Sequence, residues 1–264
     1  MKNYILLGVF IFFTTYIYSR NISLVLNNKP NANIVVPDKS NKHLNIVAKE
    51  LENYIFSSTK AKLKILNFII PSQNNIIIAT RYQDVKYNYD LLDDDGFLIR
   101  TNRNYIIISG KTDWGTEYGV YEFLEKFVGV RWLMPTELWT EVPTKSTLSV
   151  GEIDLVDSPR FLSRSFFPIN MGNKDEFLGK WGKYNRLRNR VEFHHNLKKI
   201  FNSEDIVKNN PEFLPMVNSK RYIPKNRYDR NWQPNFKAKG VDTYAANKII
   251  KYFKQHPNET SISL

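Results

Sequence analysis

Residues 95–135 read DGFLIRTNRNYIIISGKTDWGTEYGVYEFLEKFVGVRWLMP, and this stretch indicates the expected fold. Residues 96–100 and 105–109 are rich in β-branched and aromatic side chains, and a polar turn separates them. Two such runs joined by a few polar residues are typical of a β-hairpin. The stretch therefore begins with two paired strands, and the second ends at Gly110.

A helix is expected after the hairpin, beginning near Gly115. Its apolar positions recur at roughly helical spacing and are Tyr118, Tyr121, Phe123, Leu124 and Phe127. Asp113 or Thr116 is the expected N-terminal cap, because either side chain can accept hydrogen bonds from the first turn. Gly129 stands where a C-terminal cap needs a positive φ. A short buried strand over residues 130–134 is expected to complete the unit.

The residues of this stretch also resemble a known small domain. Asp95-Gly96-Phe97, GTEYGVYEFLE at 115–125 and GVRWLMP at 129–135 carry the resemblance. The pattern is similar to the α/β domain that precedes the catalytic barrel in bacterial glycoside hydrolases related to α-glucuronidases and to family 20 β-hexosaminidases. A similar arrangement precedes a group of uncharacterised secreted bacterial barrel proteins. The resemblance extends more loosely over residues 22–150 and implies an accessory domain that supports a barrel.

The segment before residue 95 fits the same domain. Apolar runs predict strands at residues 22–26, 34–36, 63–66 and 76–79. A helix is expected from about residue 41 to residue 57, with an apolar face of Leu44, Val47, Ala48, Leu51, Tyr54 and Ile55. Residues 21–150 are therefore expected to form a small mixed-sheet α/β domain with at least two helices packed on the sheet.

The N-terminus is typical of an exported protein. Lys2 supplies a positive charge, and residues 4–18 form a largely apolar stretch. That stretch is short for a transmembrane helix, which needs about 20 apolar residues. Residues 1–20 are therefore expected to be a signal peptide cleaved near Ser19, and membrane contact is expected only if this segment stays uncleaved. The chain has no cysteine, which excludes disulfides, thiolate metal sites and a cysteine nucleophile.

The chain carries a net charge of +12, which raises the question of a nucleic-acid partner. The lysines are spread along the chain, and the densest basic run is KWGKYNRLRNR at residues 180–190. This run is expected to be the exposed face of a helix whose Trp181, Tyr184 and Leu187 face inward. We therefore expect no nucleic-acid partner, no metal site and no cofactor. Attraction to an acidic polysaccharide remains open.

Residues 142–159 have a loop-like composition and are expected to form a hinge. The C-terminal segment, residues 158–264, resembles the opening of the barrel in the same families. The expected strands are 161–167, 191–197 and 260–264, and the expected helices are 175–190 and 241–255.

A short motif supports this resemblance to the barrel. NPEF at residues 210–213 and SKR at residues 219–221 are similar to the His-Pro-Glu-Tyr and Gly-Lys-Arg signature of the uncharacterised barrel group. Asn210 stands in place of His, and Ser219 stands in place of Gly.

The length after the hinge limits what the chain is expected to do. A complete (β/α)8 barrel takes about 250 residues, and about 105 residues come after the hinge. Glycoside hydrolysis generally needs two carboxyl groups that flank the scissile bond. The acidic pairs Asp175-Glu176 and Glu204-Asp205 are expected at helix starts. We therefore expect an incomplete (β/α)8 barrel, assign no catalytic residue, and expect a fragment that does not hydrolyse glycosides alone.

Three residues are candidates for sugar binding. By resemblance, Arg164 on the first expected barrel strand matches an arginine that holds sugar hydroxyls in family 20 relatives, with a salt bridge inside the barrel as the alternative. His195 and Asn196 end the second expected strand, at the face where barrel active sites form. A metal site at His194-His195 is not expected, because adjacent strand residues point to opposite faces. Burial in the core is the alternative to sugar stacking for Trp181, Tyr222 and Trp232.

Three interpretations of the whole chain stay open. The leading one is a fragment of an exported, glycoside-hydrolase-like protein whose partner is a poly- or oligosaccharide. The second is a non-catalytic carbohydrate-binding or surface protein. The third is a complete short protein whose C-terminal region folds differently.

Overall fold

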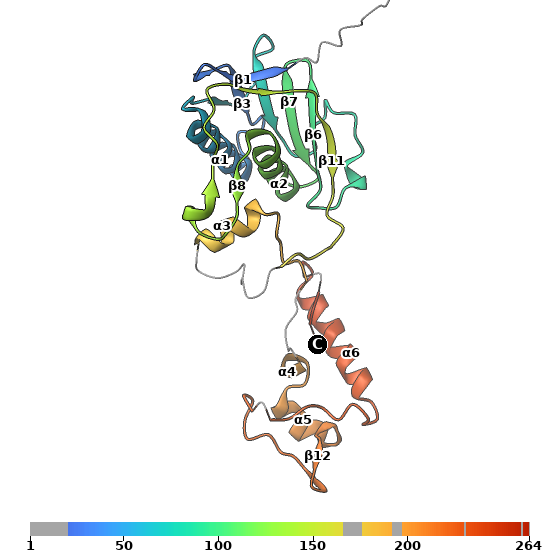
Figure 1. Ribbon diagram of the computed structural model, residues 1–264. Helices are drawn as coiled ribbons and strands as arrows, with labels where there is room; N and C mark the ends of the chain where they lie inside the picture. Colours follow the sequence, from blue (N-terminus) through green and yellow to red (C-terminus); the bar gives the residue numbers. More distant parts are fainter. Residues whose placement is uncertain (1–20, 166–175, 192–196, 230, 260, 264) are drawn as a thin grey trace, which may run out of the picture. The chain divides into compact units, whose positions relative to one another are not determined.

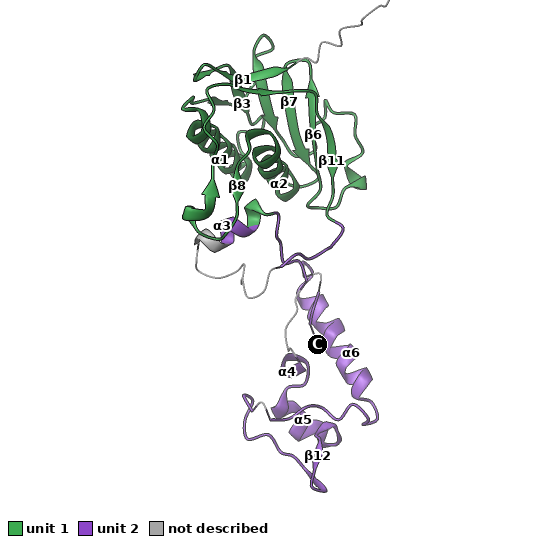
Figure 2. Cartoon of the chain, viewed as in Figure 1, with its two compact units in different colours: residues 1–159, 183–185 green, residues 160–182, 186–264 purple. Residues whose placement is uncertain are grey.

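The computed structural model describes residues 21–165, 176–191, 197–229, 231–259 and 261–263. These residues divide into two compact units (Figure 2). Unit 1 comprises the residues up to Pro159 together with Lys183–Asn185. Unit 2 comprises Arg160–Gly182 and Arg186–Leu264. The stretch at residues 95–135 therefore lies entirely in unit 1.

A six-stranded mixed sheet forms the centre of unit 1 (Figure 1). Its spatial order is β11 (Asp154–Asp157), β6 (Phe97–Asn102), β7 (Tyr105–Gly110), β5 (Asn74–Ile78), β3 (Ala32–Val35) and β4 (Lys64–Leu66). Strands β7, β5, β3 and β4 are parallel, whereas β6 is antiparallel to both of its neighbours. The expected hairpin is confirmed as β6 and β7, and the expected upstream strands are confirmed with small shifts at their ends.

Two smaller sheets complete unit 1. One has the order β10 (Leu148–Val150), β1 (Ile22–Leu26) and β2 (Lys29–Pro30), and the other pairs β8 (Arg131–Trp132) with β9 (Thr140–Glu141). The segment expected to form a hinge, residues 142–159, therefore contains two strands of unit 1. Strand β10 pairs with β1, and β11 pairs with β6, so backbone hydrogen bonding orders a segment of loop-like composition.

Helices α1 (Lys42–Thr59) and α2 (Asp113–Phe123) lie on the same face of the main sheet (Figure 1). Helix α1 contacts β3 and β4, α2 contacts β6 and β7, and the two helices contact each other. The expected apolar face of α1 is buried except for Tyr54, which is half-buried. The helix expected at residues 41–57 is therefore confirmed, with its last turn extended to Thr59.

The other face of the main sheet is covered by the connection between β5 and β6. Val85, Tyr89 and Leu92 of that connection pack against Leu98 and Ile107 of the sheet. A sheet that is buried on both faces needs apolar residues at successive positions. Strands β5 and β7 therefore have continuous isoleucine runs, because both of their faces are buried. A half-exposed strand would instead alternate apolar and polar residues.

The first turns of α2 lie directly against the backbone of the sheet. A Cβ atom on Gly115 would stand 2.3 Å from the carbonyl oxygen of Gly96. A Cβ atom on Gly119 would stand 2.8 Å from Cγ2 of Ile108. Both distances are shorter than van der Waals contact, so glycine at these two positions permits the close approach of helix and sheet.

Thr112 is the N-terminal cap of α2, and its hydroxyl accepts a hydrogen bond of 3.2 Å from the backbone N–H of Gly115. The expected caps, Asp113 and Thr116, are wrong because both residues lie inside the helix. The Thr116 hydroxyl instead accepts a hydrogen bond of 2.9 Å from the backbone N–H of Gly110. This bond joins the first turn of the helix to the end of β7.

The end of α2 is partly as expected. The helix continues as a π-helical turn over Leu124–Val128 and ends at Gly129, whose φ of 94° confirms the left-handed cap. The buried strand expected at residues 130–134 is wrong. Strand β8 covers only two residues, and Met134 is 52% exposed. Strand β8 of the small β8–β9 sheet ends at Trp132, and the side chains of Leu133 and Met134 are exposed.

Unit 2 has a small core of its own. Helices α4 (Leu197–Ile200), α5 (Ser203–Asn209) and α6 (Val241–Gln255) surround Ile200, Phe201, Ile206, Phe213, Leu214, Trp232 and Val241. The helix expected at residues 241–255 is confirmed. Glu204 and Asp205 lie at a helix start as expected, where the side chain of Asn202 accepts from both backbone N–H groups.

The expected barrel strands are not present among the described residues of unit 2. Residues 161–165 form only an isolated bridge, between Arg164 and Arg188, and Leu197 lies in α4. Helix α3 (Glu176–Tyr184) ends before the expected residue 190, and residues 261–263 form no strand. Residues 166–175, 192–196, 260 and 264, which hold the rest of these predictions, lie outside the described residues. The incomplete (β/α)8 barrel stays a prediction.

A short hairpin in unit 2 places Ser219 in a turn. Strands β12 (Met216–Val217) and β13 (Lys220–Arg221) are joined by Asn218 and Ser219, whose φ angles are 47° and 63°. Ser219 stands where the signature has glycine. Glycine adopts such a left-handed conformation at no steric cost, and serine adopts it here.

Replacing Gly119 by alanine tests the close approach of α2 to the sheet. An added methyl group in a packed core is expected to lower the free energy of unfolding by about 1–3 kcal/mol. Urea unfolding followed by circular dichroism measures this change. The control is Asn53→Ala on the exposed face of α1, which is expected to cause no loss because alanine favours the helix. Equal stability of Gly119→Ala and the unaltered chain would contradict the described packing.

Candidate functional site

The structure describes one of the three residues predicted to bind sugar. The guanidinium of Arg164 donates from Nε to the carbonyl oxygen of Arg186 at 2.8 Å and from Nη1 to that of Phe161 at 3.0 Å. These bonds join two segments of unit 2. His195 and Asn196 lie outside the described residues, so the role of the three in sugar binding stays a prediction.

The aromatic candidates lie in different surroundings. Trp232 is buried in the core of unit 2, in agreement with the alternative to sugar stacking. The hydroxyl of Tyr222 donates to Oδ2 of Asp229 at 2.8 Å, and Trp181 is half-buried.

A group of ionisable side chains lies between α1 and α2, which we call the interhelical cluster. It comprises His43 and Glu50 of α1, Glu117 and Tyr121 of α2, and Lys183 at the end of α3. All five belong to unit 1, because Lys183–Asn185 belongs to that unit. On α2, Glu117 and Tyr121 are four residues apart and therefore lie on one face of the helix.

Glu117 is the centre of the interhelical cluster. Its side chain is only 4% exposed, and both carboxylate oxygens have partners. Oε2 lies 3.0 Å from Nε2 of His43, and Oε1 lies 3.5 Å from Nζ of Lys183. Oε1 also accepts a hydrogen bond of 2.7 Å from the Tyr121 hydroxyl. The buried carboxylate is thus held by a lysine, by an imidazole whose protonated form it favours, and by a phenol, as a buried charge requires.

The Tyr121 hydroxyl also reaches a second carboxylate. Its oxygen lies 2.6 Å from Oε2 of Glu50 and 2.7 Å from Oε1 of Glu117. A phenol has one proton, so it donates to one of these carboxylates at a time. Burial raises the pKa of the Tyr121 hydroxyl, and the two neighbouring carboxylates raise it further. The phenol therefore stays protonated and remains a donor.

The pKa values of the central pair move apart. The hydrogen bond with Glu117 raises the pKa of His43, although burial opposes this change. Burial by itself would raise the pKa of Glu117, but the hydrogen bonds from His43 and Tyr121 and the charge of Lys183 together lower it. Each partner therefore favours the charged form of the other.

An aromatic group packs beside the interhelical cluster. The ring of Tyr184 stacks on Trp132 with 4.8 Å between centroids, and lies edge-on to Tyr121 at 4.9 Å. The side-chain amide of Asn185 donates to the carbonyl oxygen of Trp132 at 3.2 Å. Lys183 Nζ lies 5.0 Å from the ring centroid of Trp114. Residues 183–185 are thus attached to unit 1 by charge, by stacking and by a hydrogen bond.

The interhelical cluster does not have the arrangement of a glycosidase pair. Such a pair flanks the scissile bond of the sugar: in inverting enzymes an attacking water also lies between the two carboxyl groups, and in retaining enzymes one carboxylate is the nucleophile. Between Glu50 and Glu117 the space is occupied by the Tyr121 hydroxyl, which bonds both. The arrangement instead suits the attachment of a chain segment to the two helices.

The interhelical cluster was not predicted from the sequence. Tyr121 was expected to be part of an apolar face, and Glu117 was assigned no role. The available signal was the spacing of four between them, which places a carboxylate and a phenol on one side of the helix. Lys183 carried no such signal, because its position between the helices results from the path of a distant segment.

Comparison with known proteins gives one family match. Residues 22–123 match the family model described as Glycosyl hydrolase family 67 N-terminus. The match extends from β1 to the end of α2 and confirms the resemblance of this part of the chain to the N-terminal domain of these glycoside hydrolases. Among curated proteins, no significant match exists.

Solved structures of glycoside hydrolases are similar to part of the chain. One is a family GH115 4-O-methyl-α-glucuronidase with specificity for decorated arabinogalactans (TM-score 0.42, 18% identity, 52% of this chain and 18% of that chain). Another is the GH20 β-N-acetylhexosaminidase from Streptomyces coelicolor A3(2) (TM-score 0.38, 16% identity, 58% of this chain and 28% of that chain). A third is a mutant β-hexosaminidase from Streptomyces plicatus (TM-score 0.39, 12% identity, 55% of this chain and 25% of that chain). The chain thus spans less than a third of the length of each.

The stability of unit 1 is expected to depend on pH through His43 and Glu117. The contribution of His43, whose pKa is raised, is present below its ordinary value of 6.5 and is lost as the pH rises through the raised value. The contribution of Glu117, whose pKa is lowered, is present above its ordinary value of 4.5 and is lost as the pH falls through the lowered value. The pair therefore stabilises most between pH 4.5 and 6.5. Urea unfolding across this range measures the profile.

Glu117→Gln is the matched test of this pH dependence. The change removes the charge but keeps the shape, and it is expected to lower the free energy of unfolding between pH 4.5 and 6.5 by about 1–3 kcal/mol. It should also flatten the pH profile. The control is Asp154→Asn, which removes an ion pair with Arg100 at an aspartate side chain that is 72% exposed and should change little. A pH profile that is unaltered in Glu117→Gln would contradict the role of the cluster.

Proposed function

We propose that this chain is part of an exported, glycoside-hydrolase-like protein that acts on carbohydrate, with unit 1 as its accessory domain. The match of residues 22–123 to the family 67 N-terminus carries the proposal. On this proposal the catalytic carboxylates lie outside residues 1–264, and the chain alone does not hydrolyse glycosides.

The chemistry of unit 1 supports an accessory role. The two carboxylates that the fold brings together, Glu50 and Glu117, have a phenol between them and leave no space for a sugar. The interhelical cluster is therefore proposed to have a structural role. It attaches residues 183–185 to the two helices of the domain.

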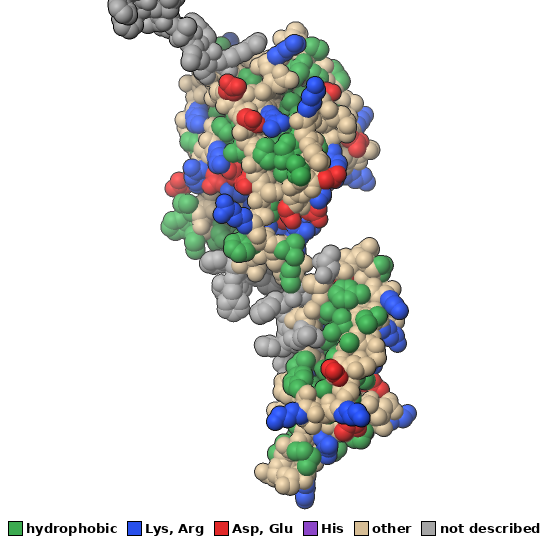
Figure 3. Space-filling model, turned by 90° about the vertical axis from the view of Figure 1, so that its right-hand side faces the viewer, with side chains coloured by type: hydrophobic (Ala, Val, Ile, Leu, Met, Phe, Trp, Pro, Cys, Tyr) green, Lys and Arg blue, Asp and Glu red, His purple; other side chains and the backbone are tan. Residues whose placement is uncertain are grey.

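The exposed apolar side chains of unit 2 support the proposal that the chain is part of a longer protein. Helix α6 has 15 residues, and Tyr244, Ala245 and Ile249 pack against the core of unit 2, but Val241 is its only fully buried residue. Figure 3 shows hydrophobic side chains on one face of unit 2. The exposed large hydrophobic side chains of this unit outside α6 include Phe161, Leu162, Met216, Val217, Ile223, Tyr228 and Phe236. A folded domain normally buries one face of such a helix, and clustered apolar exposure marks an interaction surface. We infer that further protein covers this surface in the complete molecule.

Export is proposed from the apolar segment at residues 4–18, which lies outside the described residues. Within the described part of the chain, no helix has the length and apolar character needed to cross a membrane.

Enzyme assays on two chain lengths test the proposed activity. Residues 1–264 are expected to show no turnover of aryl glycosides, whereas the product of a reading frame that continues beyond Leu264 is expected to show it. Turnover by residues 1–264 alone would refute the fragment proposal. Glycan-array binding without turnover by the longer product would favour the non-catalytic alternative.

A substitution in the apolar segment tests export. Leu7→Arg places a charge in the stretch and is expected to keep the protein inside the cell with its N-terminus intact. Asn3→Arg, just outside the stretch, is the control and should leave export unchanged. Mass spectrometry of the secreted protein should find an N-terminus near Ser19. An unaltered amount of secreted Leu7→Arg protein would overturn the proposal.

A further inference from the structure

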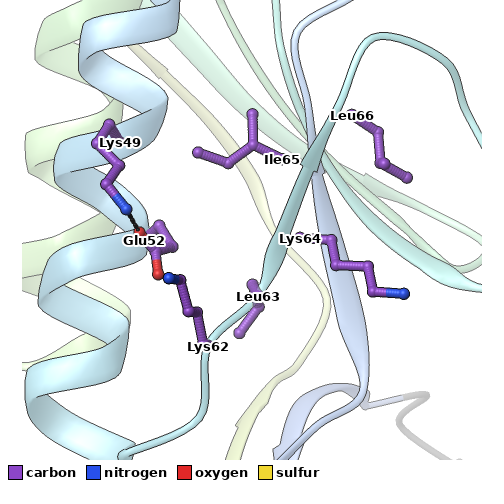
Figure 4. Close-up of a pocket in the computed structure, with 7 residues that line it drawn as sticks. All are labelled: Lys49, Glu52, Lys62, Leu63, Lys64, Ile65 and Leu66. Carbon is purple, nitrogen blue, oxygen red and sulfur yellow. Dashed lines mark hydrogen bonds and ion pairs between the residues drawn. The ribbon is translucent and has the colours of Figure 1, made fainter.

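One edge of the main sheet ends in a short strand beside a cleft. Strand β4 is the last in the sheet order and pairs only with β3 among the described residues. The cleft has a volume of about 540 Å³ and lies between α1 and β4 (Figure 4). We call this cleft the edge cleft. The residues that line it include all of β4 and are Lys49, Glu52, Lys62, Leu63, Lys64, Ile65 and Leu66.

The side chains of β4 present different chemistry on the two faces of the sheet. Figure 4 shows Ile65 pointing toward α1, and Lys64 and Leu66 pointing away from it. This alternation is the normal consequence of a strand. A strand added beside β4 would therefore have an aliphatic neighbour on the α1 side and a lysine on the opposite side.

The charge of the edge cleft is unbalanced. Three lysines and one glutamate line it, and the glutamate, Glu52, is buried and paired with Lys49. Within the described part of the chain, no ion pair joins Lys62 or Lys64 to an acidic side chain. A second cleft of about 440 Å³ shares these two lysines and adds the amides of Asn31, Asn33, Gln73 and Asn74. Lys62 and Lys64 therefore line both the edge cleft, which is partly apolar, and the second cleft, which is polar.

We propose that the edge cleft binds an extended acidic peptide of a partner protein, which adds to the main sheet as a strand beside β4. Backbone groups on the outer side of β4 supply the hydrogen bonds of strand addition. On the side of the sheet away from α1, a carboxylate of the peptide faces Lys64, and on the α1 side an apolar side chain lies against Ile65. Lys62, which extends toward α1, adds positive charge on that side. The recognised sequence is one in which acidic and aliphatic residues alternate.

The same charges exclude other occupants. Pairing of β4 with β4 of a second copy would place lysines opposite lysines in the registers centred on Leu63 or Lys64, and like charges directly opposite destabilise a strand pair. Edge lysines generally prevent unwanted pairing, and a strand with acidic residues at the facing positions escapes this repulsion. Neither cleft is lined by an aromatic side chain on which a sugar ring could stack. The proposal is independent of the glycoside-hydrolase assignment.

Fluorescence anisotropy with a labelled peptide of alternating glutamate and valine tests the proposal on the full chain. The peptide should bind, and a peptide with lysine in place of glutamate should not. The Lys62→Glu, Lys64→Glu double variant is expected to weaken binding by about tenfold or more. The control variant is Lys86→Glu, which reverses the charge of an exposed lysine in the connection between β5 and β6. This variant should leave the affinity for the peptide unchanged. Circular dichroism checks that the variants are folded.

Two further measurements separate strand addition from simple charge attraction. A peptide whose backbone nitrogens are methylated at alternate positions keeps its charges but loses donors, and it should bind at least about tenfold more weakly. Equal binding of the methylated or the lysine peptide would overturn the proposal, as would no binding of the acidic peptide. Binding of polygalacturonate that depends on Lys62 and Lys64, without peptide binding, would reassign the edge cleft to an acidic glycan. Self-association lost in the double variant would reassign it to a second copy.

Discussion

The first turn of α2 lies on the backbone of β6 and β7, and the packing of unit 1 depends on this contact. Gly115 stands so close to the carbonyl of Gly96 that no side chain fits between them, and Thr116 bonds the end of β7. Close packing of helix on sheet transmits small changes in volume, because protein interiors have few voids. The contact also orients the helix. With Gly115 and Gly119 turned to the sheet, Glu117 and Tyr121 face away from it and toward α1.

The interhelical cluster results from that orientation. A carboxylate that is only 4% exposed is costly unless its charge is balanced, and His43 and Lys183 balance it from two different parts of the chain. Breaking such a group by removing one partner leaves a buried charge without its counterion. Helix α1, helix α2 and residues 183–185 therefore depend on one another, although they are distant in sequence. This mutual dependence suits a domain whose proposed role is to support another module.

The two edges of the main sheet differ in a way that bears on function. At one edge, β11 covers β6 with a segment whose composition resembles a loop. At the other edge, β4 ends the sheet among the described residues with lysines and a cleft beside it. Both end strands pair on one side only among the described residues, and β4 has lysines and a cleft beside it. The surface best suited to a partner strand thus lies far from the sequence motif that identifies the domain.

Much of unit 1 was predictable from the sequence, because its signals are local. The hairpin of β6 and β7, the amphipathic α1 and the cap at Gly129 each arise from neighbouring residues whose spacing or conformational preference is visible in the chain. The cap of α2 was expected at Asp113 or Thr116 and lies at Thr112, since all three side chains can accept hydrogen bonds and only the folded structure selects among them. The strands β10 and β11 were missed because they depend on a free sheet edge rather than on their own composition.

The type of domain could be recognised from the order of residues alone, since periodicity and turn residues specify strands and helices without reference to distant parts of the chain. The same residues carried the resemblance that the family match over residues 22–123 confirms. Which polar residues meet, in contrast, became visible only in the folded chain. Glu117 lies 74 positions from His43 along the chain, and Lys183 is farther still from His43. No local preference encodes such a meeting, because it results from the path of the whole chain over the sheet.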